Sequence, residues 1–366
     1  MSRRVLLTGL GAVSPLGLSA SDQPTGDAQW RFDDVVAAAD PSMDATVPHE
    51  VRTIPDTFSI KDYVTPVGLR RKQRFSQIAM AAAVDGFARA GFAERPADLD
   101  RVGMVANTEY GPQRVVSDYL DGLIGNGLLE ASPGLFTQTV YNVANGQASL
   151  ALGLRGANST LVGGSAVAYA ALLVQNGKAD AILALSVDET NEIMTAYFDA
   201  AVTADADLLF PFRTGEASAV VVLESEESAA ARGATVLGEL LGVSLASARG
   251  TGLSYLDWSE DDDTIEYTMR GAIADAGLPI DDIDLVVATG NGWGGLTRSE
   301  LSAIAALGYE GPLVYPRLVT GECFGGNEAM SYVLGLDASE PGHTVLVTVA
   351  TANGGVTSTV VRKAAS

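Results

Sequence analysis

The chain repeats one helix-to-strand pattern, and this repeat constrains its fold more than any other feature. A helical pattern at residues 76–91 leads through a loop to a β-rich run at 99–106. The same order returns with a helix at 264–277 and a strand at 283–288. Chains that alternate helices and strands bury them as mostly parallel sheets covered by helices. The repeat therefore predicts an α/β fold made of two similar halves.

A second helix and a second strand follow in each half. Two glycines and a serine at 163–165 precede an apolar helix that leads to a strand at 181–185. Two glycines and an asparagine at 325–327 precede its counterpart, which leads to a strand at 344–349. The two units thus contain similar elements in the same order, which indicates an internal duplication.

The two repeats meet between residues 225 and 233, and this interval is the expected boundary. We predict an N-terminal half at 1–225 and a C-terminal half at 233–366. A chain of 366 residues has the length of about two ordinary domains, and we expect the halves to form one compact unit.

The opening run at 5–11 is β-rich and apolar and ends in glycines, which is typical of a buried parallel strand. Glycines after a first strand also raise the question of a dinucleotide site. The spacing argues against one, because Ser14 stands where the last glycine of the motif is needed and Pro15 follows where a helix should begin.

Composition excludes several classes of partner and site. The chain has 23 Lys and Arg against 45 Asp and Glu, a formal net charge of -22, which repels nucleic acid and anionic lipid. Its single cysteine, Cys323, excludes an internal disulfide and a Cys-rich metal site. The two histidines, His49 and His343, stand in loop-like segments. No apolar run approaches the ~20 residues of a membrane span, so we expect a cytoplasmic protein with no membrane partner.

Several motifs, in order along nearly the whole chain, resemble the β-ketoacyl synthases of the thiolase superfamily. The resemblance implies a thiolase-like fold, in which duplicated α/β halves give a layered α-β-α-β-α architecture, and it implies no cofactor. The motifs are the opening RRVLLTGLGAVSPLG at 3–17, RRKQRFSQ at 70–77, NVANGQASLALG at 142–153, GANST at 156–160, FPFRTGEASAVVVLE at 210–224 and NGG at 353–355.

The residues needed for condensation are replaced. An active ketosynthase needs a thiolate at a helix N-terminus and two imidazoles that act on the malonyl thioester. The resemblance places Ser165 at the cysteine position and Asn291 and Glu322 at the two histidine positions. Arg317 stands where the family usually has lysine, and Asn353 replaces the phenylalanine beside the nucleophile. Three lost catalytic groups argue against decarboxylative condensation.

Each replacement also has a purely structural interpretation. Ser165, after two glycines, has the features of a helix N-cap. Asn291 lies between Gly290 and Gly292 and has the features of a turn residue that tolerates positive φ. Glu322 in an apolar pocket must be paired or protonated, and we expect it to pair with Arg317.

Within the resemblance, the members that keep the fold and lose the catalytic set are the chain-length factors of bacterial type II polyketide synthases. The resemblance implies a non-condensing subunit that forms a heterodimer with an active ketosynthase. That subunit shapes the tunnel limiting the polyketide or polyene chain, and it meets acyl carrier protein indirectly through the ketosynthase. The interface segment is expected at 110–140, where periodicity alone would equally fit a helical core face. The tunnel or interface candidates are Tyr119, Leu123, Phe136 and Val140.

Two alternatives remain open at this point. The chain could be a divergent thiolase-fold acyltransferase or hydrolase that uses Ser165 as the acyl acceptor, although the motifs provide no base for it. It could also be a scaffold that docks other synthase components and contributes no tunnel.

Overall fold

The computed structural model describes residues 3–23, 29–31, 51–65, 72–92, 98–128, 131–203, 207–248 and 255–365. Hydrogen bonds join the strands of this described part into one mixed sheet with the order β2-β9-β8-β10-β11-β7-β1-β6-β5-β3-β4. The strands are β1 Val5–Val13, β2 Gln29–Arg31, β3 Val102–Thr108, β4 Asn158–Val162, β5 Ala181–Asp188, β6 Ala217–Ser225, β7 Gly238–Ser247, β8 Leu285–Val287, β9 Pro312–Val314, β10 Thr344–Ala350 and β11 Gly355–Lys363.

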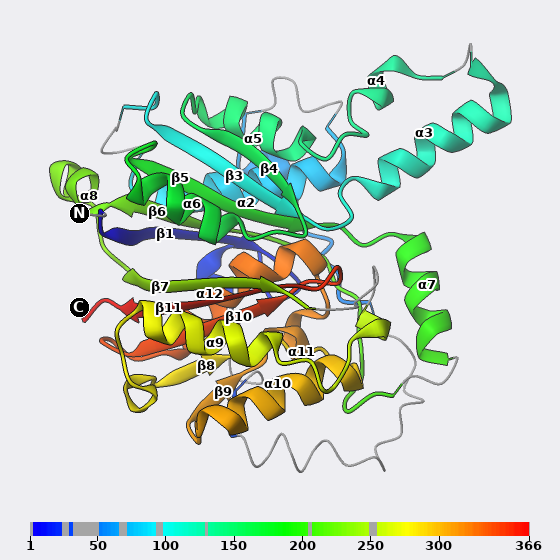
Figure 1. The fold of residues 1–366 in the computed structure, drawn as a ribbon. Coiled ribbons are helices and arrows are strands. Elements are labelled where there is room, and N and C mark those ends of the chain that lie inside the picture. The colour runs from blue at the N-terminus through cyan, green and yellow to red at the C-terminus, as the bar shows by residue number, and fades with distance from the viewer. Residues whose placement is uncertain are drawn as a thin grey trace.

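Helices cover both faces of the sheet (Figure 1). Short 3-10 turns connect some of these elements, and the one that matters for the site is Phe324–Gly326. The α-helices are α2 Arg74–Arg89, α3 Gln113–Asn126, α4 Pro133–Phe136, α5 Val143–Leu152, α6 Ala166–Gln175, α7 Glu192–Thr203, α8 Glu226–Arg232, α9 Thr264–Asp275, α10 Gly294–Leu307, α11 Pro316–Thr320 and α12 Asn327–Ala338.

The strand order repeats, as the sequence predicted. The first half contributes β4-β3-β5-β6-β1 and the second half contributes β9-β8-β10-β11-β7, so these ten strands form five pairs of counterparts, and β2 lies beside β9 without a counterpart among the described strands. Directions repeat as well. The pairs β3·β5 and β8·β10 are parallel, whereas β5·β6 and β10·β11 are antiparallel. The predicted α/β fold with duplicated halves is therefore confirmed.

Three apolar clusters show that the halves stack in five layers. One cluster lies between the outer helices α2 and α5 and the first half of the sheet. A second surrounds α6 and α12, which lie between the two halves, and a third lies between the second half and the outer helices α9 and α10. Figure 1 shows α9 and α10 covering the face opposite α12. The predicted α-β-α-β-α layering is confirmed.

The sequence predicted that the opening strand β1 is buried and parallel to its neighbours. It is buried, but it is not parallel to them. It pairs antiparallel with β6 on one side and, over Val5 to Leu7, with β7 on the other, which joins the two halves. Its glycines serve helix packing: a Cβ on Gly11 would lie 2.3 Å from the Ala82 carbonyl oxygen of α2. An apolar run in the sequence indicates that a strand is buried, but it does not indicate the direction of the neighbouring strands.

Helix α8 fills the interval between β6 and β7, where the sequence suggested a boundary. Arg232 at its end is buried and forms an ion pair of 2.6 Å with the buried carboxylate of Glu224. Its guanidinium also donates to the Ala90 carbonyl oxygen and lies 4.1 Å from the centre of the Phe92 ring. These contacts attach the segment to the outer layer. The division at 225–233 stays a prediction.

Over the described residues, no helix is both long enough and apolar enough to span a membrane.

Candidate functional site

The residues at the predicted catalytic positions lie where strands of both halves end. Ser165 follows β4 and begins α6, whereas Asn291 follows β8. Glu322 lies between α11 and α12, and Asn353 lies in the turn between β10 and β11. Loops at the carboxyl ends of strands are the usual location of sites in α/β folds.

A buried carboxylate occupies the beginning of helix α6. Ser165 is the N-cap, and its Oγ accepts a hydrogen bond of 3.0 Å from the Ala168 amide. Its hydroxyl donates to Oε1 of Glu328. Glu328 also accepts from two helix amides, Ala166 at 2.8 Å and Val167 at 3.3 Å. The side chains of Ser165 and Glu328 thus accept hydrogen bonds from the free N–H groups at the start of α6.

This arrangement changes what the helix start can do. Burial raises the pKa of Glu328, and the bonds from Ser165 and the helix amides oppose that rise. In acyl transfer, such amides would stabilise the oxyanion of the intermediate. Here an internal carboxylate already holds them. Sequence reasoning missed Glu328, because an acidic residue in the first turn of a helix is ordinary.

Asn291 and Glu322 lie together in a buried polar network. Oε2 of Glu322 accepts from the Asn291 amide at 2.9 Å and lies 3.0 Å from Nη1 of Arg317, the expected partner. Its Oε1 accepts from the Phe324 backbone at 2.9 Å and from the Asn327 side chain. A carboxylate held by four groups is a structural anchor.

Asn291 does not adopt the positive φ that a residue in such a turn would tolerate. Among the described residues, Phe324 is the single non-glycine residue with positive φ, at 49°, while Gly292 has φ 101°. Asn291 is instead fixed by its side chain, which donates to Glu322 and accepts from the Trp293 amide at 3.2 Å. The turn uses Gly292 for backbone conformation and Asn291 for its amide group.

Aromatic rings fill the space beside this network. The Phe324 ring lies 4.8 Å from that of Tyr110 and 5.3 Å from that of Phe198, measured between centroids. The series continues from Phe198 to Phe212 at 5.1 Å and from Phe212 to Trp293 at 5.4 Å. The left-handed backbone at Phe324 costs roughly 1 kcal/mol, and these ring contacts offset it.

Two further acids lie at the carboxyl ends of β3 and β5. Asp188 accepts backbone bonds from Glu109, Gly111 and Gly325 at 2.7 to 2.9 Å, and burial raises its pKa to about 6. Glu109 accepts from the Ala352 amide at 2.9 Å. Its burial, together with the charges of neighbouring acids, raises its pKa well above the ordinary value.

These acids do not form a metal site. Across the described part of the chain, no group of three or more His, Cys, Asp or Glu side chains is placed to hold a metal ion. Backbone amides and side chains of the protein occupy the oxygens of Asp188 and Glu322 instead.

The predicted interface residues lie on an arm formed by α3 and α4, which projects from the body of the molecule (Figure 1). Phe136 is 57% exposed and Val140 is 45% exposed, whereas Tyr119 and Leu123 are half-buried. The Tyr119 and Phe136 rings lie 5.7 Å apart. Val115 is the one fully buried residue of α3, so these four side chains do not form a core face.

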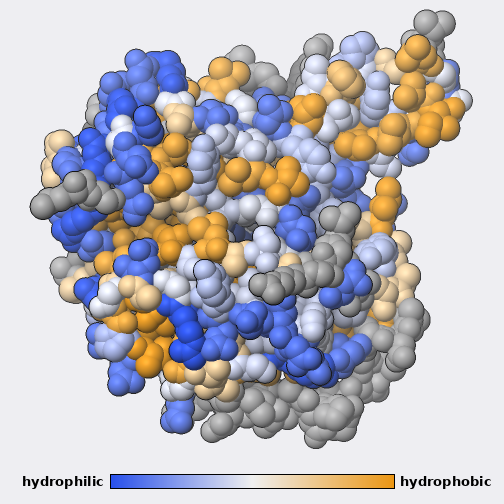
Figure 2. Space-filling view, in the orientation of Figure 1, coloured by the Kyte–Doolittle hydropathy of each residue, from blue (hydrophilic) through white to orange (hydrophobic). Residues whose placement is uncertain are grey.

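Hydrophobic side chains gather on this arm (Figure 2). Leu120, Ile124 and Leu128 are spaced four residues apart and are all exposed, Ile124 by 80%. These leucine and isoleucine side chains form an exposed apolar patch on the projecting arm.

The fold and the positions of the site residues together define a ketosynthase-like protein. Residues 2–229 match the family described as beta-ketoacyl synthase, N-terminal domain. This match covers more than half of the chain, and the chain belongs to the beta-ketoacyl synthase family.

Individual relatives agree with this assignment. The chain is 28% identical over 320 residues to nodulation protein E of Rhizobium sp. (strain N33), covering 83% of this chain and 77% of that protein. It is 26% identical over 314 residues to 3-oxoacyl-[acyl-carrier-protein] synthase 2 of Staphylococcus aureus (strain COL), covering 79% of this chain and 73% of that one. The ishigamide ketosynthase/chain length factor structure shares the fold, with a TM-score of 0.80, 21% identity and 99% coverage of both chains.

The position of the Glu328 carboxylate allows a prediction about the reactivity of a thiol introduced at Ser165. In Ser165→Cys the thiolate would face a carboxylate, which opposes its formation, although a helix start alone favours it. We expect iodoacetamide at neutral pH to modify Ser165→Cys/Glu328→Gln at least about tenfold faster than Ser165→Cys. Peptide mass spectrometry after timed quenching measures both rates.

The control is Glu328→Gln with Ser165 intact. Its only thiol is the buried Cys323, whose pKa is raised by burial, so background labelling should be slow. Equal rates in the two cysteine variants would show that Glu328 does not control this position.

Glu189, next to Asp188, predicts an unusual dependence of stability on pH. It is 1% exposed, so its carboxylate is shielded from water. Burial raises its pKa to about 7, and the charge of Arg114 opposes the rise. A folded-state pKa above the unfolded value means that the stability is present at low pH and is lost as pH rises through about 7.

We therefore expect Glu189→Gln to be more stable than the native chain at pH 8, by about 2 to 3 kcal/mol, and this difference to shrink towards pH 5. Urea unfolding at several pH values measures it. The exposed Glu227→Gln serves as control for the substitution itself. A Glu189→Gln difference that is constant from pH 5 to 8 would contradict the assignment.

Proposed function

We propose that this chain is a non-condensing, chain-length-factor-like subunit that pairs with an active ketosynthase and shapes the tunnel controlling polyketide or polyene chain length. The observation that carries the proposal is the occupied start of helix α6. Ser165 replaces a thiol there, and the Glu328 carboxylate holds both the serine hydroxyl and the helix amides. A chain that keeps a synthase fold without a working nucleophile needs a partner that makes the bonds.

The projecting arm supports the second part of the proposal. Its exposed side chains include Ile124, Leu128 and Phe136, which are large and apolar. The strand β4 lies at one end of the sheet, where its outer edge has no strand partner among the described residues. An apolar arm and an unpaired edge strand are both features that association with a second subunit would cover.

The comparison with solved structures agrees with a paired role. The ishigamide structure combines a ketosynthase with a chain length factor, according to its description. In a pair of that kind, this chain would supply tunnel walls and the ketosynthase would supply the Cys-His-His chemistry. Acyl carrier protein would then deliver its cargo to the ketosynthase and meet this chain indirectly.

Phe136 provides the test. If its ring limits the tunnel, Phe136→Ala should open space, so the complex with the cognate ketosynthase should still assemble and should release longer products. Because the ring is 57% exposed in the isolated chain, its removal should leave the thermal midpoint nearly unchanged. Size-exclusion chromatography measures assembly, and mass spectrometry measures product length.

Tyr267→Ala is the matched control, since it removes an aromatic ring that is 65% exposed on the outer helix α9. Product length should stay unchanged in this variant. If Phe136→Ala and matching changes at Tyr119, Leu123 and Val140 all assemble and give native product lengths, this arm does not form the tunnel. Failure of the native chain to bind the ketosynthase would overturn pairing itself.

One observation favours a second candidate, an acyltransferase or hydrolase. The Ser165 hydroxyl donates to the Glu328 carboxylate, whose pKa is raised by burial. In this candidate, Glu328 would be the base that the sequence motifs lacked. Against it, Ser165 is 5% exposed and the amides that would hold an oxyanion are occupied. A docking scaffold without a tunnel is the third possibility, and the product-length experiment separates it from the first.

Intact mass distinguishes the first two candidates. After incubation of the pure chain with acyl carrier thioesters, we expect no added acyl mass and no accelerated release of free acid. An acyl adduct that disappears in Ser165→Ala would establish the serine enzyme instead.

A further inference from the structure

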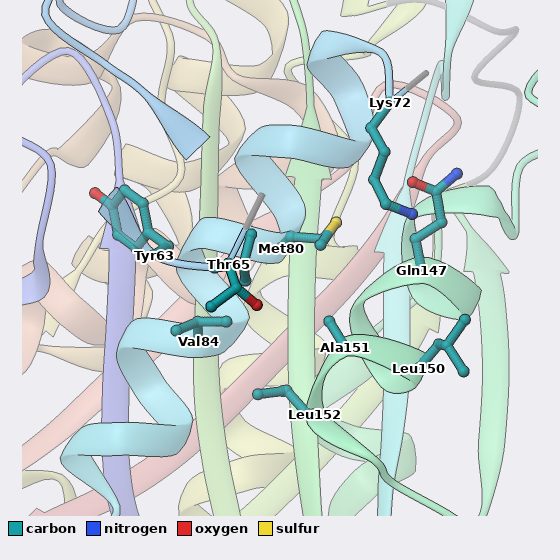
Figure 3. A pocket seen from close by; sticks show the side chains of 10 residues that line it. Tyr63, Thr65, Lys72, Met80, Val84, Gln147, Leu150, Ala151 and Leu152 are labelled. Atoms are coloured by element: carbon teal, nitrogen blue, oxygen red, sulfur yellow. The ribbon is translucent and has the colours of Figure 1, made fainter. Parts of the chain in front are cut away.

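A cavity of about 530 Å³ lies on the outer layer of the first half, apart from the site described above. Its walls come from α2, from α5 and from the segment at 63–65, and Figure 3 shows these side chains surrounding one space. The volume falls in the range of roughly 300 to 1,000 Å³ that is common for small-ligand pockets.

Apolar side chains from α2 and α5 form one part of the cavity wall. Met80 and Val84 contribute from α2, and Leu150, Ala151 and Leu152 contribute from α5. Leu150 is 80% exposed although it is large and aliphatic. An aliphatic chain placed here would cover apolar surface that the isolated chain leaves in contact with water, which favours its binding.

Lys72 gives the cavity one cationic end. It precedes α2 and reaches into the cavity opposite Tyr63 (Figure 3). Burial lowers its pKa. Among the described residues, no carboxylate forms an ion pair with it. In a chain with 45 acidic residues, a partly desolvated lysine without an acidic partner offers a place for an anion from outside.

Gln147 adds a second polar group at the same end of the cavity in Figure 3. Its Oε1 is shielded from solvent, and no group of the described residues donates a hydrogen bond to it. Buried amide oxygens nearly always accept a hydrogen bond, so this atom calls for a donor. A ligand with a hydroxyl group close to its anionic group would supply one.

We propose that this cavity binds an aliphatic carboxylate, with Lys72 pairing with the carboxylate, Gln147 accepting from a hydroxyl on the neighbouring carbons, and α2 and α5 covering the chain. A medium-chain 3-hydroxy acid has all three features. The inference does not depend on the proposed subunit role, because none of these residues belongs to the occupied helix start or to the arm.

Calorimetry with the full chain and three probes tests the proposal. The probes are decanoate, 3-hydroxydecanoate and the neutral 1-decanol, each below its aggregation limit. We expect saturable 1:1 binding of both acids, tighter binding of the hydroxy acid, and binding of the alcohol at least about tenfold weaker than that of decanoate. Equal binding of decanol and decanoate, or no saturable binding of either acid, would overturn the proposal.

Variants assign the two polar contacts. Lys72→Met keeps the length and apolar stem of the side chain, and it should weaken the binding of decanoate at least about tenfold. Lys61→Met, at an exposed lysine outside the cavity, should leave binding unchanged. Gln147→Leu should abolish the preference for the hydroxy acid while keeping decanoate binding. Native affinity in Lys72→Met would place the anion elsewhere.

Filling the cavity provides a test that needs no charge change. Val84→Trp puts an indole into the space between α2 and α5, and it should abolish binding of both acids. Circular dichroism and the thermal midpoint establish that each variant is folded. If folded Val84→Trp binds decanoate like the native chain, the cavity is not the binding site.

Discussion

The burial of α6 and α12 between the two halves is the interaction on which the rest of the structure depends. Each half has one sheet face covered by its own outer helices, and the other face needs the central pair. The residues at the predicted catalytic positions surround the beginnings of these two helices. A single packing constraint therefore stabilises the duplicated fold and holds the candidate site in place, whether or not the site retains chemistry.

Most of this architecture could be predicted from the sequence, because the spacing of apolar residues indicates which helices and strands are buried. The helix expected at 76–91 is α2 at Arg74–Arg89, and the strand expected at 344–349 is β10 at Thr344–Ala350. The direction of β1 could not be predicted, since an apolar strand reads the same beside parallel and antiparallel neighbours. The projecting arm was also ambiguous, because a helix that packs on its own core and one that packs on a partner have the same amphipathic pattern.

The site was predictable only where a motif fixed a position. Ser165, Asn291 and Glu322 were placed by spacing, and the pairing of Glu322 with Arg317 followed from the physics of a buried charge. The roles of Glu328, Glu109 and Glu189 could not be predicted from the sequence, because they arise from contacts and burial that only the folded chain creates. Glu328 reaches Ser165 across 163 positions of the chain, and no local pattern records that distance.

The Glu328 carboxylate has a consequence for how such a chain can change over generations. Once an internal acid satisfies the amides at the start of α6, a mutation that restores a thiol at Ser165 gains nothing by itself. Removing the acid alone leaves helix amides unsatisfied in the central layer, which destabilises the fold. Each single step back is thus neutral or harmful. A return to a free helix start therefore needs both changes together.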